Sequence, residues 1–176
     1  AGELKVETTG PGRAGNIEMT TQELTLTDEV IVSTSTNNVG QAGNIILNAD
    51  ILNVTNGAEI LAETKGSGDG GTIIVNAPTA VNLGIGVQDF APILSVETSD
   101  AGRAGNIFIN TPNFVLSETA KITATATESA TNLDGGGSIT LSADQMDLAG
   151  EVGIFAETQG QSSGGVLTLQ PYRPDR

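Results

Sequence analysis

Two glutamates come nearest, by type and spacing, to a reactive site in this chain. Glu63 and Glu97 occupy equivalent positions in successive copies of a repeated unit. The full set of equivalent positions is Glu7, Ser33, Glu63, Glu97, Thr125 and Glu157. If successive copies stack as strands, the two carboxylates lie ~4.8 Å apart. Like charges this close raise one pKa or attract a cation, so the pair is a candidate cation site. A solvated pair on an outward face is the alternative interpretation.

The rest of the composition argues against catalysis. The chain has no His and no Cys, which removes the usual general base, the thiolate nucleophile and disulfides. A carbohydrate-cleaving site would need further acidic and basic side chains beside the two glutamates. Lys65 and Arg103 instead fall in predicted turns. We therefore expect no enzyme, and we keep carbohydrate binding or polysaccharide-lyase-type cleavage as the alternative function.

Two glycine-rich segments resemble calcium-binding turns. They are the stretches from Gly66 to Gly71 and from Asp134 to Gly137. The calcium-binding nonapeptide repeat places Asp at a fixed position in consecutive turns. Asp69 and Asp134 stand at different distances from the glycine that follows, so ordinary turns account for both segments. The sequence predicts no cofactor, with Ca²⁺ left open.

Charge limits the partners. Lys and Arg total 7 against 21 Asp and Glu, a net charge of −14. Nucleic acids and anionic membrane surfaces require a basic face, so neither is an expected partner. No segment approaches 18 consecutive apolar residues, and we expect no membrane insertion.

The elements that position these residues follow from an internal repeat. The motif G-x-A-G-N-I, or a near copy, recurs with its first core residue at Ile17, Ile45, Ile73, Ile107, Ile139 and Leu167. The spacings are 28, 28, 34, 32 and 28 residues. A fixed period of this length indicates stacked repeats.

Each copy contains three stretches of alternating apolar and polar residues, separated by Gly, Asn, Asp and Pro. Such alternation is typical of strands with one buried face. The sequence predicts an all-β, right-handed parallel β-helix of five to six coils with three short strands in each.

Equivalent residues of successive coils then form columns. The structural corner columns are Gly15, Gly43, Gly71, Gly105, Gly137 and Gly165, followed by Asn16, Asn44 and Asn106. Glycine fits a corner with positive φ or close backbone approach, and the amides can hydrogen-bond between coils.

Two outward columns are candidate contact surfaces. On the first strand, the position between the two core residues is apolar in three consecutive copies, at Ile46, Ile74 and Phe108. A second, less continuous column consists of Ile31, Leu61, Ser95, Thr123 and Phe155. A contiguous exposed apolar strip marks an interaction site. The alternative is that the insertion from Gly84 to Pro92 folds over the first strip.

We divide the chain into a β-helix domain of residues 1–170 and a C-terminal tail or linker of residues 171–176. The chain begins partway through a repeat, so we expect a piece of a longer protein or a unit that stacks. Two prolines and two arginines after the last predicted strand favour a stop to strand pairing.

The unit Gly40–Ala49 (GQAGNIILNA), together with Asn56–Thr64 (NGAEILAET), resembles the repeats of filamentous-haemagglutinin-like exoproteins, particularly cyanobacterial members. The likeness covers nearly the whole chain. It implies a secreted protein at the cell surface or in the extracellular space, exported by two-partner secretion. It also implies a structural role as the shaft of an adhesin or matrix filament. The partners it implies are other copies or other matrix and cell-surface components, including glycans.

Overall fold

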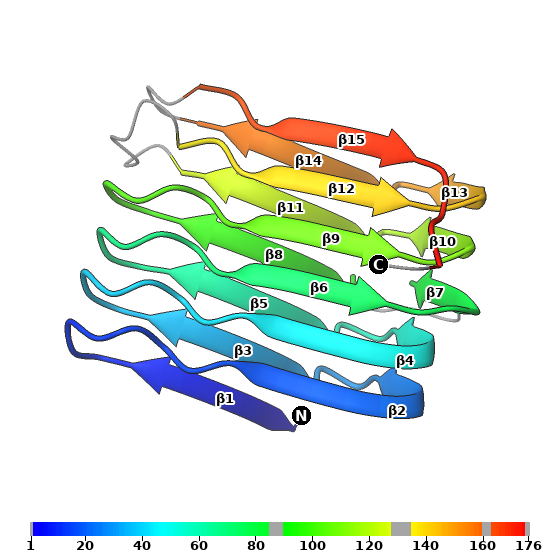
Figure 1. The fold of residues 1–176 in the computed structure, drawn as a ribbon, viewed down its shortest axis with the longest axis horizontal. Coiled ribbons are helices and arrows are strands. Elements are labelled where there is room, and N and C mark those ends of the chain that lie inside the picture. The colour runs from blue at the N-terminus through cyan, green and yellow to red at the C-terminus, as the bar shows by residue number, and fades with distance from the viewer. Residues whose placement is uncertain (1, 85–89, 128–134, 160–162, 175–176) are drawn as a thin grey trace.

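A computed structural model of the chain describes residues 2–84, 90–127, 135–159 and 163–174. These residues form a parallel β-solenoid of about five turns and contain no helix. Successive coils stack along one axis, as Figure 1 shows. The predicted all-β stacked-repeat fold is confirmed. No helix of the described residues is long and apolar enough to cross a membrane.

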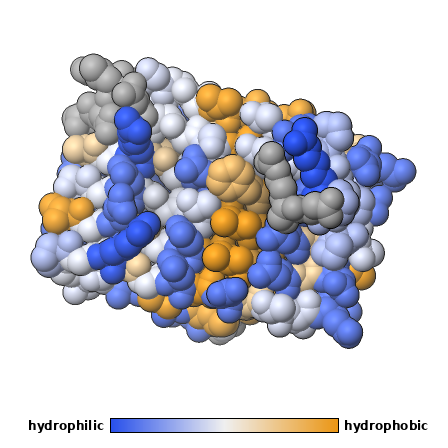
Figure 2. All heavy atoms as spheres, in the orientation of Figure 1, coloured by the Kyte–Doolittle hydropathy of each residue, from blue (hydrophilic) through white to orange (hydrophobic). Residues whose placement is uncertain are grey.

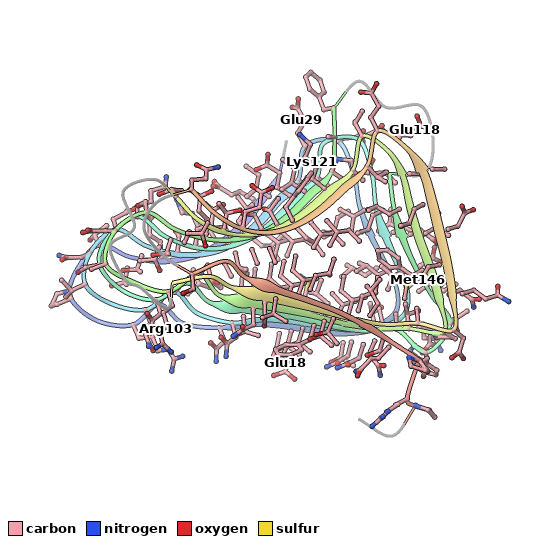
Figure 3. The ribbon with its side chains drawn as sticks, turned by 90° about the horizontal axis from the view of Figure 1, so that it is seen from above. Glu18, Glu29, Arg103, Glu118, Lys121 and Met146 are labelled. Atoms are coloured by element: carbon pink, nitrogen blue, oxygen red, sulfur yellow. The ribbon has the colours of Figure 1, made fainter. Side chains whose placement is uncertain are left out.

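Each coil has three faces, and viewed along the stack it is roughly triangular (Figure 3). The first face contains β6 (Thr72–Asn76), β9 (Asn106–Asn110), β12 (Ser138–Ser142) and β15 (Val166–Gln170). The second face contains β7 (Ala80–Leu83), β10 (Asn113–Glu118) and β13 (Gln145–Gly150). The third face contains β1 (Glu3–Thr8), β3 (Ile31–Thr36), β5 (Glu59–Thr64), β8 (Ile93–Thr98), β11 (Lys121–Ala126) and β14 (Gly153–Thr158). The strand pairs within these faces are parallel.

Two long strands, β2 (Ile17–Leu26) and β4 (Ile45–Val54), bend through the corner and belong to both the first and second faces. The prediction of three separate strands per coil therefore holds only from the third coil onward. Pro78 and Pro112 stand at this corner in the third and fourth coils. Proline has no backbone N–H to donate to a ladder, so each long strand is divided in two there.

The interior is filled by inward columns of branched apolar side chains (Figure 3). Ile45, Ile73, Ile107 and Ile139 lie directly above one another and are completely buried. Burying one such side chain contributes about 1.5–3 kcal/mol. The sequence repeat therefore produces one continuous hydrophobic core.

The third strand of the second coil lies in a different register from the one predicted. The predicted columns on this face place Ile31 beside Leu61 and Ser33 beside Glu63, which aligns Val30 and Val32 with the apolar pair Ile60 and Ala62. In the structure Val32 pairs with Ile60, and Thr34 pairs with Ala62. The 28-residue spacing is kept through the corner, so Val30 lies before the strand and Thr34 occupies a core position. Its hydroxyl donates to Gly43 O at 2.9 Å.

The corner glycines are explained by close backbone approach. A Cβ on Gly43, Gly71 or Gly105 would overlap the carbonyl oxygen of the corner glycine one coil earlier. None of the three has a positive φ. Glycine is therefore required at these corners by the close approach of the backbones and not by a left-handed backbone conformation. Asn16 Oδ1 and Asn44 Oδ1 accept the backbone N–H groups of Asn44 and Thr72, which links consecutive coils.

The chain leaves the stack after β15. Tyr172 N donates to Asp144 Oδ1 at 3.2 Å, and Arg173 O accepts from Asn110 Nδ2 at 2.9 Å. The tail therefore runs back along the corner between the first and second faces, as the red trace in Figure 1 shows. Residues 171–174 do not pair with β15 as a further strand.

Candidate contact surface

The first face carries a continuous apolar strip. Ile46 pairs with Ile74, and Ile74 pairs with Phe108, on adjacent strands β4, β6 and β9. Phe108 is exposed, and the two isoleucines are half-buried. Figure 2 shows hydrophobic side chains gathered across the middle of this face, with hydrophilic side chains on both sides. The structure thus brings together the three residues of the first predicted column. We call them the first-face strip.

Polar, uncharged columns border the strip on both sides. The column two residues before it contains Asn44, Thr72, Asn106 and Ser138. The column two residues after it contains Asn48, Asn76, Asn110 and Ser142. Side-chain bonds connect neighbouring coils on both sides, from Asn76 Nδ2 to Asn48 Oδ1 at 2.9 Å and from Ser138 Oγ to Asn106 Oδ1 at 2.6 Å. Asn44 and Asn106 belong to the predicted corner column, whereas the second amide column was not predicted from the sequence.

A hollow lies at the end of the strip, beside Phe108. In the next coil the strip position is Thr140, whose side chain is much smaller than the phenylalanine ring. The resulting depression has a volume of about 240 Å³. Its lining combines the strip with the second amide column: Ile74, Asn76, Phe108, Ile109, Asn110, Thr140, Ser142 and Gln170.

The second predicted column, on the third face, is wrong at one position, Ile31. Ile31 pairs with Glu59, and Leu61 pairs with Ser33 and Ser95. The true column is Lys5, Ser33, Leu61, Ser95, Thr123 and Phe155. The apolar members Leu61 and Phe155 are separated by Ser95 and Thr123, so this column forms no continuous strip. The cause is the register of β3, which is displaced by two residues from the predicted one.

The described part of the insertion after Gly84 does not cover the first-face strip. Phe90 and Ala91 lie at the corner that precedes the third face, in a groove of about 480 Å³. The other lining residues are Glu29, Ile31, Gly57, Glu59 and Ile93. A Cβ on Gly57 would lie 2.8 Å from the Phe90 Cβ, so the glycine provides the space for this residue. Ile85 and Val87 of the insertion lie outside the described residues.

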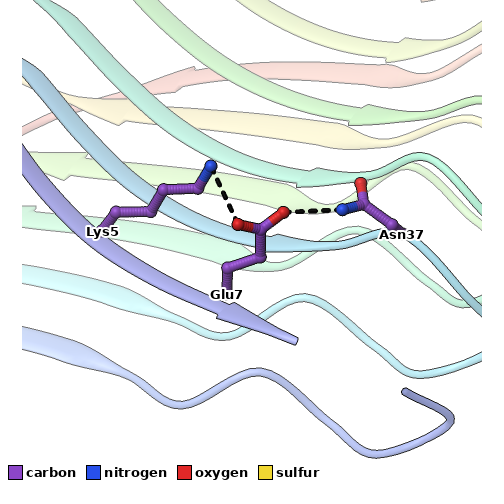
Figure 4. Close-up of polar contacts among 3 residues, drawn as sticks. All are labelled: Lys5, Glu7 and Asn37. Atoms are coloured by element: carbon purple, nitrogen blue, oxygen red, sulfur yellow. Dashed lines mark hydrogen bonds and ion pairs between the residues drawn. The ribbon is translucent and has the colours of Figure 1, made fainter. Parts of the chain in front are cut away.

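Glu63 and Glu97 are neighbours on the outward side of β5 and β8. Leu61 pairs with Ser95 and Thr64 pairs with Thr98, which places the two glutamates side by side. The remaining column differs from the prediction at one position, because Ser35, and not Ser33, aligns with Glu63. At the edge of the face, Glu7 is paired: Lys5 Nζ lies 3.0 Å from Glu7 Oε2, and Asn37 Nδ2 donates to Glu7 Oε1 at 2.6 Å (Figure 4).

Burial raises the pKa of Glu63 above its ordinary value, and the nearby Glu97 carboxylate raises it further. A hydrogen bond with Ser95 and the charge of Lys65 act in the opposite direction. The pKa of Glu97 is also raised, by burial, against the effect of Lys65. Lys65 lies in the turn after β5, as predicted, yet its charge reaches both carboxylates. Ionisation of either carboxylate therefore lowers the stability of the folded state.

This cost predicts a pH-dependent effect of Glu63→Gln. A carboxyl group with a raised pKa binds its proton more tightly in the folded than in the unfolded chain. Its contribution to the free energy of unfolding therefore falls as pH rises through the raised pKa. We expect Glu63→Gln to raise the free energy of unfolding at pH 7 and to leave it unchanged at pH 3, where Glu63 is protonated in both states. Urea denaturation at the two pH values measures the difference. Glu151→Gln, an exposed substitution of the same charge, is the control, and an equal gain from both variants would contradict the prediction.

The candidate metal residues do not form a larger cluster. Within the described ranges, no group of three or more Asp, Glu, His or Cys side chains is placed to hold a metal ion. Glu63 and Glu97 thus remain a pair. Asp69 is engaged in the turn, where Oδ1 accepts from Arg103 N at 2.8 Å and Oδ2 accepts from Gln41 Nε2 at 3.1 Å. Asp134 lies outside the described residues.

Comparison with known proteins finds no matching family model, no similar curated protein and no similar solved structure.

Proposed function

We propose that this chain is a structural and adhesive segment of an extracellular protein of the filamentous-haemagglutinin-like kind. In this role a rigid solenoid presents its first face to other matrix or cell-surface components, or to a second copy. The mechanism is passive: the stacked coils hold contact residues at fixed intervals, and no covalent step is involved. The resemblance of the repeats to that family supports the extracellular assignment.

The observation that carries the proposal is the first-face strip. Ile46, Ile74 and Phe108 form one apolar band on consecutive coils, at outward positions where polar side chains would be expected. The chain around it is strongly acidic, with a net charge of −14. A contiguous apolar band on such a surface favours association with something else.

We expect Ile74→Lys to abolish association, because a lysine in the middle of the strip would bury an unpaired charge in any contact. Self-association is measured by sedimentation velocity, and adhesion by co-pelleting with insoluble extracellular matrix. The matched control is Val115→Lys, a β-branched residue at a half-buried position between buried Phe114 and Leu116 on the second face. Association unaffected by Ile74→Lys, or a wild-type chain that neither self-associates nor pellets, would refute the proposal.

A carbohydrate-cleaving solenoid is the second candidate. It is favoured by the adjacent Glu63 and Glu97, whose raised pKa values would suit a proton-transfer role. The groove around them has a volume of about 380 Å³ and includes Leu61, Ser95 and Thr123. Release of reducing ends from a polysaccharide by the purified chain, lost in Glu63→Gln, would establish this function in place of the passive one.

A further inference from the structure

We infer that the first face binds a neutral polysaccharide, and that the hollow beside Phe108 holds one of its pyranose rings. This inference rests on the proposed function, since it names the chemical class of the partner that the first-face strip contacts. It is carried by three features of the described residues: the absence of charge, the arrangement of apolar and amide columns, and the hollow.

The face is uncharged over the region that matters. From β4 to β12, the strip and its two bordering columns contain only Asn, Thr, Ser, Ile and Phe at outward positions. Charged residues beside these columns include Arg13, Asp69 and Arg103 on one side and Arg173 on the other, whose backbone oxygen accepts from Asn110 Nδ2. The chain as a whole carries a net charge of −14. The net charge of −14 opposes the approach of a polyanionic glycan, and a polycation would be attracted to many parts of the surface. A neutral ligand is the class for which an uncharged face gives selective binding.

The column order matches the two kinds of surface on a sugar ring. A pyranose ring presents C–H groups on its flat faces and hydroxyl groups around its edge. The Phe108 ring and the Ile74 side chain can contact the flat face, and the aromatic ring, with its negative face, favours C–H groups above it. Asn76 and Asn110 stand beside them. Each Nδ2 already donates one hydrogen bond, to Asn48 Oδ1 and to Arg173 O respectively, and an amide side chain has a second N–H and an oxygen to offer to hydroxyl groups.

The hollow beside Phe108 is the place on this face where one sugar ring would bind. Its volume of about 240 Å³ suits one sugar ring. Phe108 forms one wall, Thr140 stands one coil further along, and Ser142 and Gln170 add polar groups at its edge. Gln170 Nε2 donates to Ser142 Oγ at 2.9 Å, so these two side chains are already fixed before a ligand arrives. Fixed polar groups around an apolar wall are the usual composition of a small-molecule site.

The first-face strip also sets the direction in which the bound polysaccharide runs. Phe108, Ile74 and Ile46 follow one another along the solenoid axis at strand spacing, ~4.8 Å. A polysaccharide aligned with the axis would place further rings over Ile74 and Ile46. Glu18 is the next residue of the column and ends the uncharged region.

The test uses a soluble β-1,4-linked glucose hexamer with the whole chain, and binding is measured by titration calorimetry. Polygalacturonate serves as the charged probe. We expect the hexamer to bind and polygalacturonate not to bind. We expect Phe108→Ala to weaken hexamer binding at least tenfold and Phe108→Tyr to restore it. Phe155→Ala removes a comparably exposed phenylalanine from the third face, and it should bind as the wild type does. Far-UV circular dichroism verifies that each variant is folded.

Three results would overturn the inference: no hexamer binding at millimolar concentration, equal loss in Phe108→Ala and Phe155→Ala, or equal affinity for polygalacturonate. These outcomes are separable from failure of the proposed function. A wild-type chain that self-associates through Ile74 but ignores the hexamer would show that the partner of the strip is a second copy. The proposed function would then stand without the glycan.

Discussion

Gly68→Ala is expected to destabilise the solenoid by more than about 3 kcal/mol, a large effect for one methyl group. A Cβ at this position would overlap Gly40 O in the preceding coil and would lie 2.9 Å from Val39 O. Both atoms belong to the backbone, so no side-chain rotation can relieve the overlap. The two coils would have to separate locally, which weakens the hydrogen bonds between them.

Gly12→Ala is the matched control for this substitution. Gly12 stands in the same column of the repeat, one copy before Gly40, but a Cβ there meets no atom of the described residues within 4 Å. We expect its free energy of unfolding to equal the wild-type value or to exceed it by about 0.4–1 kcal/mol, through the reduced freedom of the unfolded chain. Urea denaturation of both variants measures the contrast. Equal losses would mean that this column needs glycine for its backbone conformation and not for the approach of the coils.

Ile73→Ala is expected to cost about 2–5 kcal/mol, the usual range for truncating a fully buried aliphatic side chain. Ile73 lies in the middle of its inward column, between Ile45 and Ile107, and is completely buried. The neighbouring strands β4 and β9 are held in place by their parallel pairing with β6, so they cannot close the space that the lost atoms leave.

Leu167→Ala tests whether stacking is the source of that cost. Leu167 occupies the same column in the last coil, where it pairs with Ile139 on one side only and is 45% exposed. Its truncation should cost less than about half as much as that of Ile73, because less surface is buried. Denaturation followed by circular dichroism compares the two variants. A cost for Leu167 that matched that of Ile73 would contradict a core built by stacking between neighbours.

The architecture could be predicted because the repeated motif marks the same position in the first strand of every coil, and this fixes which residues pair between coils. The repeated motif aligned the first-strand columns correctly: Ile46 and Ile74 are spaced by 28 residues, and the motif also identified Phe108 across a spacing of 34. The error at Ile31 and Ser33 arose where apolar character was followed in place of spacing. Val30 and Val32 match Ile60 and Ala62 in apolar character, whereas counting residues through the corner gives the pairing of Val32 with Ile60 that the structure has.

Other features depend on three-dimensional detail that no single column reveals. The hollow beside Phe108 exists because a large side chain is followed by a small one in the next coil and because Gln170 reaches Ser142. The raised pKa of Glu63 depends on burial within a sheet face that the alternating pattern marks only as outward. The position of Phe90 over Gly57 depends on an insertion, for which the repeat offers no template.

The ladders between coils run along the length of the rod, and this direction determines how the molecule would bear a load. Tension applied to the two ends pulls against those hydrogen bonds one turn at a time, and not against all of them together. The turn between the bonded residues Asn16 and Asn44 would release 28 residues on opening. Fully extended, that length adds roughly 95 Å to the chain. Such a segment would yield in steps under pulling and absorb mechanical work while its remaining turns stay folded.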